Sequence, residues 1–207
     1  MDDILQKWDR SLGLEQLRKI DLNIQRRSFL ANSVKTATAV TILPVVPFLT
    51  ACSEDNVTKQ QELMDTPPWS TFAVVQQQLF PDDGNGPGAA QINATSYLKF
   101  VLDSKDTDPD DREFIYSGIG WLNDLSNKDY QNNFSNCDTK QQQTILTKIA
   151  KSNAGERWLS YLLLYIFEAL LSDPVYGGNP NGVGWQWLQH QPGFPSPPTN
   201  KRYVDLQ

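Results

Sequence analysis

The stretch from Trp158 to Leu171 constrains the fold most, because only Ser160 and Glu168 interrupt its run of apolar residues. As an α-helix it would be about 21 Å long, which is shorter than the hydrocarbon core of a membrane. A helix that is apolar on all sides has to be covered on all sides. We therefore expect the central helix of a bundle. Partial coverage by a second protein is the alternative, and both can hold together.

Apolar residues three and four positions apart predict helices in four other segments. These segments are Trp69 to Phe80, Gln91 to Leu102, Pro109 to about Leu125, and Asp138 to Ile149. A run rich in glycine and proline, from Pro81 to Gly88, separates the first two as a loop. The sequence therefore predicts an all-α fold: a small helical bundle with a long irregular C-terminal segment rich in Gly, Pro and Trp.

The start of the third of these helices has two interpretations. Asp108 is a favoured helix cap, and Pro109 suits the first helical position. Asp106, Asp108 and Asp110 also stand at every second position, as at the start of a calcium-binding loop. That loop requires Gly where Asp111 stands and Glu where Ser117 stands, so the pattern indicates a helix start. Within the same helix, Gly118 and Gly120 weaken the helix intrinsically, or they allow another helix to approach closely.

The chain has two cysteines, Cys52 and Cys137. If Cys52 is lipidated, Cys137 has no partner within the chain, so a disulfide framework is excluded. Cys137 precedes a predicted capping box formed by Asp138 and Gln141. We interpret Cys137 as a small buried apolar residue, and a disulfide to another chain is the alternative.

Two adjacent arginines, Arg26 and Arg27, are followed by Phe29 and Leu30 and then by a modestly apolar stretch up to Thr50. Twin arginines before such a stretch are typical of the address for twin-arginine export, which carries folded proteins. A transmembrane anchor is the alternative. The stretch is short for a membrane span, however, and prolines interrupt it.

The apolar stretch ends in a lipobox-like sequence before Cys52, which predicts lipidation at that cysteine and a membrane anchor. We expect three parts: an export segment with lipobox (1–51), a polar tether (52–66) and a helical domain (67–207). The predicted location is the periplasmic side of the cell envelope, anchored to a membrane through the lipid. The formal net charge of −6 disfavours contact with phosphate backbones, so no nucleic-acid partner is expected.

The segment after the apolar helix carries glycines, prolines and tryptophans in close succession. A phosphate cradle would need a strand before the glycines and a helix after them, and neither is predicted here. Trp185 and Trp187 either fold back onto the bundle or serve as anchors in a protein interface. We expect a partner interface at Asp173, Pro174, Tyr176, Gly177, Gly178, Asn179, Gly182, Gly184, Trp185 and Trp187.

The same segment carries a family resemblance. The run from Asp173 to Asn179, then Gly182 to Trp185 and Pro192-Gly193, resembles the signature of the gluconate 2-dehydrogenase subunit 3 family. The loop around Pro81 and Gly86 to Gly88 is similar to that family's N-terminal loop, and the region from Phe134 to Ile149 resembles its middle helices. The resemblance covers most of residues 69–195, although Cys137 stands where a larger apolar residue is expected.

The resemblance implies an all-α accessory subunit whose partner is a large flavoprotein dehydrogenase of the glucose–methanol–choline (GMC) type. That partner would carry FAD, lack an export signal of its own and travel through twin-arginine export as a folded passenger. A cytochrome c subunit is a further implied partner. The residues of this chain themselves indicate no catalytic, cofactor or metal site.

Two other functions fit parts of the sequence. A stand-alone periplasmic lipoprotein could hold a ligand with the loop from Tyr176 to Trp187. An enzyme in its own right would use Asp173, Tyr176 or His190 as acid or base, but no spacing pairs a nucleophile with a base. We interpret His190 as a solvated loop residue.

Overall fold

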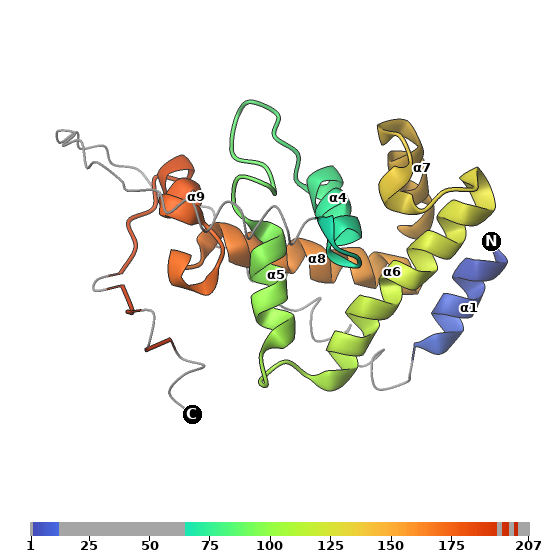
Figure 1. Cartoon of the computed structure of the whole chain (residues 1–207), viewed down its shortest axis with the longest axis horizontal. Coiled ribbons are helices and arrows are strands. Elements are labelled where there is room, and N and C mark those ends of the chain that lie inside the picture. Colours follow the sequence, from blue (N-terminus) through green and yellow to red (C-terminus); the bar gives the residue numbers. More distant parts are fainter. Residues whose placement is uncertain (1, 13–64, 194–195, 199–200, 203–207) are drawn as a thin grey trace, which may run out of the picture.

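The computed structural model describes residues 2–12, 65–193, 196–198 and 201–202, where every regular element is a helix (Figure 1). The helices are α1 (Asp3–Ser11), α4 (Trp69–Leu79), α5 (Ala94–Asp103), α6 (Pro109–Tyr130), α7 (Thr139–Ile149), α8 (Asn153–Leu171) and α9 (Val183–Trp187). Short 3-10 helices lie at η2 (Phe134–Asn136), η3 (Pro174–Tyr176) and η4 (Pro180–Gly182). The predicted all-α class is confirmed. The expected irregularity of the C-terminal segment is not confirmed, since η3, η4 and α9 occupy much of it.

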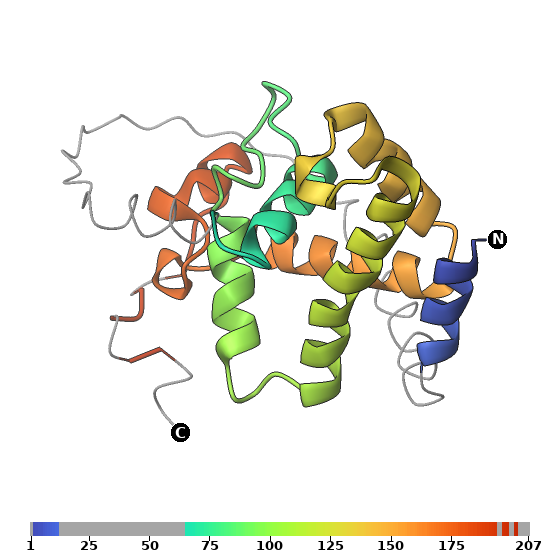
Figure 2. The ribbon, with the colours of Figure 1, turned by 45° about the vertical axis from the view of Figure 1, so that its right-hand side comes forward.

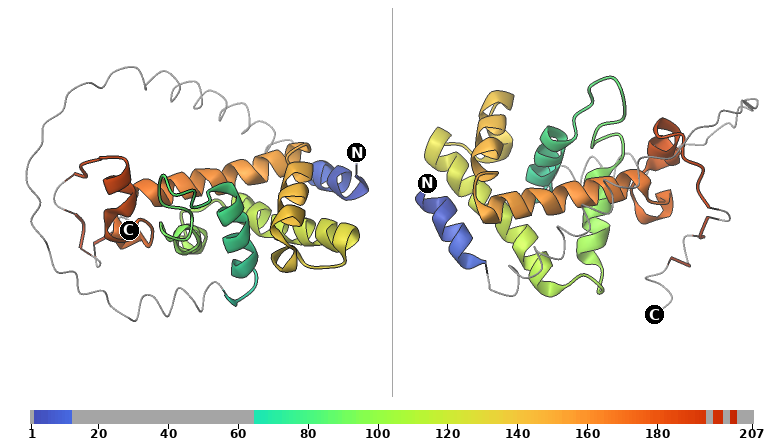
Figure 3. Two further views of the ribbon diagram at one scale, coloured as in Figure 1. Left: turned by 90° about the horizontal axis from the view of Figure 1, so that it is seen from above. Right: turned by 180° about the vertical axis from the view of Figure 1, so that it is seen from behind.

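Helix α8 is the axis of the body, and α1, α4, α5, α6, α7 and α9 all contact it (Figure 3). Trp158, Leu162, Ile166 and Ala169 of α8 have no exposed surface. The prediction of a central helix is confirmed, because packing on several sides requires apolar residues around most of the circumference. No helix in the described ranges, α8 included, has the length and hydropathy needed to span a membrane.

The helix caps predicted at Asp108 and Asp138 are present in the structure. The Asp108 carboxylate accepts a hydrogen bond from the Asp110 amide at 2.9 Å, as expected for a cap at the start of α6. Asp138 and Gln141 form both hydrogen bonds of the predicted capping box. These bonds depend on residues only two or three positions apart, which is why the sequence alone reveals them.

Three helix boundaries differ from the prediction by three residues or more. Helix α8 begins at Asn153 rather than Trp158, because Ser152 caps it ahead of the apolar run. Helix α5 begins at Ala94 rather than Gln91, because Asn93 has a φ of 55°, which is incompatible with a continuing right-handed helix. Helix α6 extends to Tyr130, beyond Leu125, and Gln131 ends it with a φ of 56°. The last turn of α6 is largely exposed and polar, so it carries no apolar pattern by which the sequence could reveal it.

The two glycines of α6 have different surroundings. A Cβ atom at Gly118 would overlap the indole nitrogen of Trp158, whereas a Cβ atom at Gly120 would meet no atom within 4 Å. Gly118 therefore lets α8 approach α6 closely, and the Trp158 indole N–H donates to the Ile115 carbonyl at 2.9 Å. Of the two interpretations considered, close approach holds at Gly118 only.

Cys137 is 6% exposed, and its sulfur lies 3.2 Å from the hydroxyl oxygen of Ser126 on α6. The thiol is free in this chain. Its burial fits the interpretation as a small apolar residue.

Helix α1 lies at one end of the body, beside the N-terminal end of α8 (Figure 2). Leu5 is 3% exposed and Trp8 is 1% exposed, and both belong to the main hydrophobic core. These residues lie within the predicted export segment (1–51), for which no helix of the folded body is expected. The structure makes residues 2–12 part of the bundle.

Candidate partner-binding surface

The chain leaves α8 through a short turn fixed by Asp173. Its carboxylate accepts the Val175 amide at 3.1 Å, and Pro174 opens η3. Gly177 follows with a φ of 93°, a conformation that suits glycine. The predicted end of the central helix at Asp173 and Pro174 is confirmed.

Asn179 holds the following loop in place, and the side chain is fully buried. Its amide nitrogen donates to the Ser172 carbonyl at 3.0 Å, and its amide oxygen accepts from the Gly184 amide at 2.7 Å. Its backbone amide donates to the Ile92 carbonyl at 2.9 Å. One residue therefore connects the end of α8, the start of α9 and the turn before α5.

Two of the loop's glycines permit close packing on α8. A Cβ atom at Gly184 would overlap the Leu170 carbonyl oxygen, and one at Gly178 would lie 2.8 Å from the Ala169 carbonyl oxygen. Gly177 and Gly182 instead adopt positive φ angles. The glycines of the predicted interface thus determine the path of the backbone. Among the aromatic side chains of that interface, Trp187 is the exposed one.

Trp185 and Trp187 attach α9 to the rest of the molecule. The Trp185 indole N–H donates to the Leu171 carbonyl at 2.8 Å, and the Trp187 indole N–H donates to the Asn85 carbonyl at 2.8 Å. The Trp187 ring lies directly over Gly86, where no Cβ atom would fit. The loop of residues 81–88 and the C-terminal loop, distant in sequence, therefore form one structural unit.

Five large apolar side chains of the described ranges are exposed, and all lie on α8 or at α9. They are Leu164 (44%), Phe167 (49%), Leu171 (52%), Trp187 (42%) and Leu188 (45%). Leu164, Phe167 and Leu171 have spacings of three and four, which places them on one face of α8. Half-buried Phe80 joins the two helices, because its ring centroid lies 6.3 Å from those of both Phe167 and Trp187.

We call these six residues the α8–α9 patch: Phe80, Leu164, Phe167, Leu171, Trp187 and Leu188. Contiguous exposed apolar side chains on a folded domain mark a surface that another molecule covers. Of these residues only Trp187 belongs to the interface predicted from the sequence; the three α8 residues, Phe80 and Leu188 do not. The signal was present in the all-round apolar character of Trp158 to Leu171, but its sequence does not separate exposed positions from buried ones.

Glu168 lies next to Phe167 on α8 and is half-buried. Burial raises the pKa of its carboxyl group, and the hydrogen bond donated by the Tyr97 hydroxyl at 3.2 Å partly opposes that rise. The carboxylate therefore adds a polar, titratable group to an otherwise apolar face of α8.

The three residues weighed as acids or bases have other contacts. Asp173 caps η3, the Tyr176 ring lies 5.6 Å from that of Phe100, and exposed His190 lies beside Trp185. Over the described ranges, no group of three or more His, Cys, Asp or Glu side chains is arranged to hold a metal ion. The remaining site residues, Arg26, Arg27, Phe29, Leu30 and Cys52, lie outside the described residues.

A family model described as "Gluconate 2-dehydrogenase subunit 3" matches residues 67–193. The chain belongs to this family. No curated protein and no solved structure gave a match. Membership in the gluconate 2-dehydrogenase subunit 3 family indicates an accessory subunit of a dehydrogenase complex, associated with the other subunits of that complex. The matched range includes the whole α8–α9 patch and excludes α1.

Proposed function

We propose that this chain is the non-catalytic small subunit of a flavin-dependent GMC-type dehydrogenase acting on a sugar, polyol or gluconate. In this proposal the chain binds the large catalytic subunit through the α8–α9 patch. The observation that carries it is the gathering of all five exposed large apolar side chains of the described ranges at one place, within the range matched by the family.

The composition of the patch suits a protein partner. Aromatic residues at the centre of an interface contribute much of the binding energy. The Phe80 ring packs against the rings of both Phe167 and Trp187. The loop that accepts the Trp187 hydrogen bond at Asn85 also carries the exposed residues Asp82 and Asp83, which adds negative charge next to the patch. We therefore expect an apolar pocket flanked by Lys or Arg on the large subunit.

The proposal also includes export and anchoring. The twin arginines Arg26 and Arg27, followed by Phe29 and Leu30, would direct the folded complex through twin-arginine export, and lipid on Cys52 would tether it to the membrane. The large subunit would supply the FAD and the substrate pocket, and a cytochrome c subunit would accept electrons.

Co-purification tests the proposed interface. Phe167→Asp places a charge at the centre of the α8–α9 patch, so a large subunit expressed with this variant is expected to be lost from a tagged small subunit. Gln143→Asp is the matched control, since it adds the same charge at an exposed position of α7. The proposal fails if Phe167→Asp retains the large subunit as well as the control does. Isolation of the wild-type chain as a solitary monomer would favour the stand-alone lipoprotein.

Export is tested separately. Replacement of Arg26 and Arg27 by lysine is expected to leave both subunits in the cytoplasm, with dehydrogenase activity confined to that fraction. Normal export of the large subunit in this variant would contradict the escort role and leave the interface proposal intact.

A further inference from the structure

Helix α1 lies outside the family-matched residues 67–193 but contributes to the main core. Its apolar face consists of Leu5, Trp8 and Leu12, which are 3%, 1% and 8% exposed. The Trp8 ring is surrounded by three aromatic rings of the body. They belong to Phe114, Trp121 and Trp158, with centroids 6.4, 6.3 and 6.0 Å away. Helix α1 therefore packs into the main hydrophobic core of the bundle.

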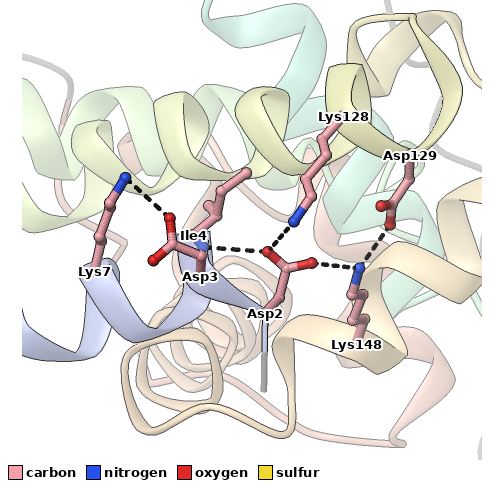
Figure 4. A network of polar contacts seen from close by, with 7 residues as sticks. All are labelled: Asp2, Asp3, Ile4, Lys7, Lys128, Asp129 and Lys148. Carbon is pink, nitrogen blue, oxygen red and sulfur yellow. Dashed lines mark hydrogen bonds and ion pairs between the residues drawn. The ribbon is translucent and has the colours of Figure 1, made fainter.

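Charged contacts fix the start of α1 (Figure 4). One carboxylate oxygen of Asp2 accepts from Lys128 at 2.8 Å, and the other from Lys148 at 2.9 Å. The same side chain caps α1 by accepting the Ile4 amide at 3.1 Å, and it is only 8% exposed. Lys148 also pairs with Asp129 at 2.9 Å. The lysines hold the pKa of the Asp2 carboxyl well below its usual range.

The other end of α1 is fixed by a hydrogen bond between the Asp9 side chain and the backbone of α8. The Asp9 carboxylate accepts the Ala154 amide at 2.7 Å. That amide belongs to the first turn of α8, where backbone N–H groups have no partner within the helix. Ser152 caps the neighbouring Gly155 amide at 3.1 Å. Helix α1 thus supplies a second cap to the central helix from a distant part of the sequence.

Together these contacts define an acceptor site for one helix. We name it the α1 groove, formed by Phe114, Trp121 and Lys128 of α6, Lys148 of α7, and Ala154 and Trp158 of α8. Its aromatic side chains contact the apolar face of a helix, and its two lysines pair with an acidic N-cap residue. At the other end, the Ala154 amide has no partner within α8 and donates to a second carboxylate of the bound helix. Residues 2–12 match all three features.

We infer that the α1 groove is a binding site for an amphipathic helix with an acidic N-cap, and that α1 is its occupant even when α1 is no longer covalently attached. Binding then depends on the groove contacts and not on the chain between α1 and α4. If the proposed processing at Cys52 occurs, α1 remains on the mature domain as a second, non-covalent chain. That consequence rests on the proposed function, whereas the binding itself does not.

The test uses the full chain with a site-specific protease sequence inserted between residues 13 and 51. The purified protein is cut at micromolar concentration, and its fragments are separated by size-exclusion chromatography and identified by mass. The expected result is one peak that contains both fragments. Separation of the wild-type fragments, whatever the state of the larger one, overturns the inference.

Single substitutions test whether retention follows the observed contacts. Asp2→Asn keeps a good helix cap but loses the ion pairs with Lys128 and Lys148, so it is expected to weaken retention by about tenfold or more. Lys7→Gln is the control, because Lys7 is 60% exposed and its ion pair within the described ranges is with exposed Asp3, at 3.1 Å. Equal retention of the Asp2→Asn and Lys7→Gln chains would show that the groove does not recognise α1 through its cap residue. No dehydrogenase is present, so failure here leaves the proposed function untouched.

Discussion

The two glycines of α6 give a prediction in which the same substitution has opposite effects at positions two residues apart. Gly120→Ala adds a methyl group where no atom lies within 4 Å, and Gly118→Ala adds one against the buried indole of Trp158. Both changes replace a poor helix former by the best one. The difference between them therefore reports the α6–α8 contact.

The magnitudes follow from these surroundings. In a helix interior Ala is more favourable than Gly by about 1 kcal/mol, which is the gain expected for Gly120→Ala. At Gly118 the same gain is opposed by overpacking of about 1–3 kcal/mol. Displacement of Trp158 also disrupts its 2.9 Å hydrogen bond to Ile115, which contributes about 1 kcal/mol. The net result for Gly118→Ala is a loss of about 1–3 kcal/mol.

Urea unfolding of the full chain, followed by circular dichroism, measures both variants against the wild type. The expected order of unfolding free energies is Gly120→Ala, then wild type, then Gly118→Ala, with unchanged slopes against urea. Stabilisation by both substitutions would refute the close approach of α8 to α6. Destabilisation by both would show that Gly120 is not exposed to open space as the structure places it.

Three further substitutions, with Asp3→Asn as the control for the first, test other contacts by their effect on the free energy of unfolding. Asp2→Asn is expected to lower it by about 1–3 kcal/mol at neutral pH, and exposed Asp3→Asn by no more than about 0.5 kcal/mol. The lysines lower the pKa of Asp2 in the folded state, so the Asp2→Asn deficit should shrink as the pH falls below 3.8, and a constant deficit would contradict the ion pairs. Glu168→Gln is expected to stabilise at neutral pH, because burial raises the pKa of Glu168 and its charged form is disfavoured on folding. That gain should be gone once the pH is below 4.5, the ordinary pKa of the group, and destabilisation at neutral pH would refute it. Gly184→Ala is expected to destabilise by about 1–3 kcal/mol through overlap with α8, and a neutral result would exclude the close packing of α9.

Features set by neighbouring residues could be predicted from the sequence. The caps at Asp108 and Asp138 depend on hydrogen bonds within one turn, and the structure contains both. The central position of α8 was predictable for a different reason, since a helix without a polar face has no other stable place in a bundle. Each of these conclusions needs only the local pattern.

Features set by distant residues could not be predicted. Leu162 and Phe167 are both apolar, but the first is fully buried and the second is 49% exposed. The difference depends on which helices cross α8 and where. In the same way, Gly118 is packed against Trp158, whereas Gly120 has no atom near it. The contact of Trp187 with Gly86 joins loops about a hundred residues apart.

Helix α1 shows a third situation. Leu5, Trp8 and Leu12 have the spacing of one helical face, so a signal was present. The neighbouring twin arginines, however, indicate an export segment over residues 1–51, and a segment of that kind is not expected to pack into the core. The structure shows that residues 2–12 belong to the folded body.

Site-specific photocrosslinking tests the central proposal, the binding of the large dehydrogenase subunit by the α8–α9 patch, most directly. A photoreactive phenylalanine analogue replaces Phe167 in one variant and Gln143, on the outer face of α7, in another. On irradiation of the assembled complex, we expect the analogue at position 167 to form a covalent product with the large subunit and the analogue at position 143 to form none. A product from position 143 without one from position 167 would contradict the account.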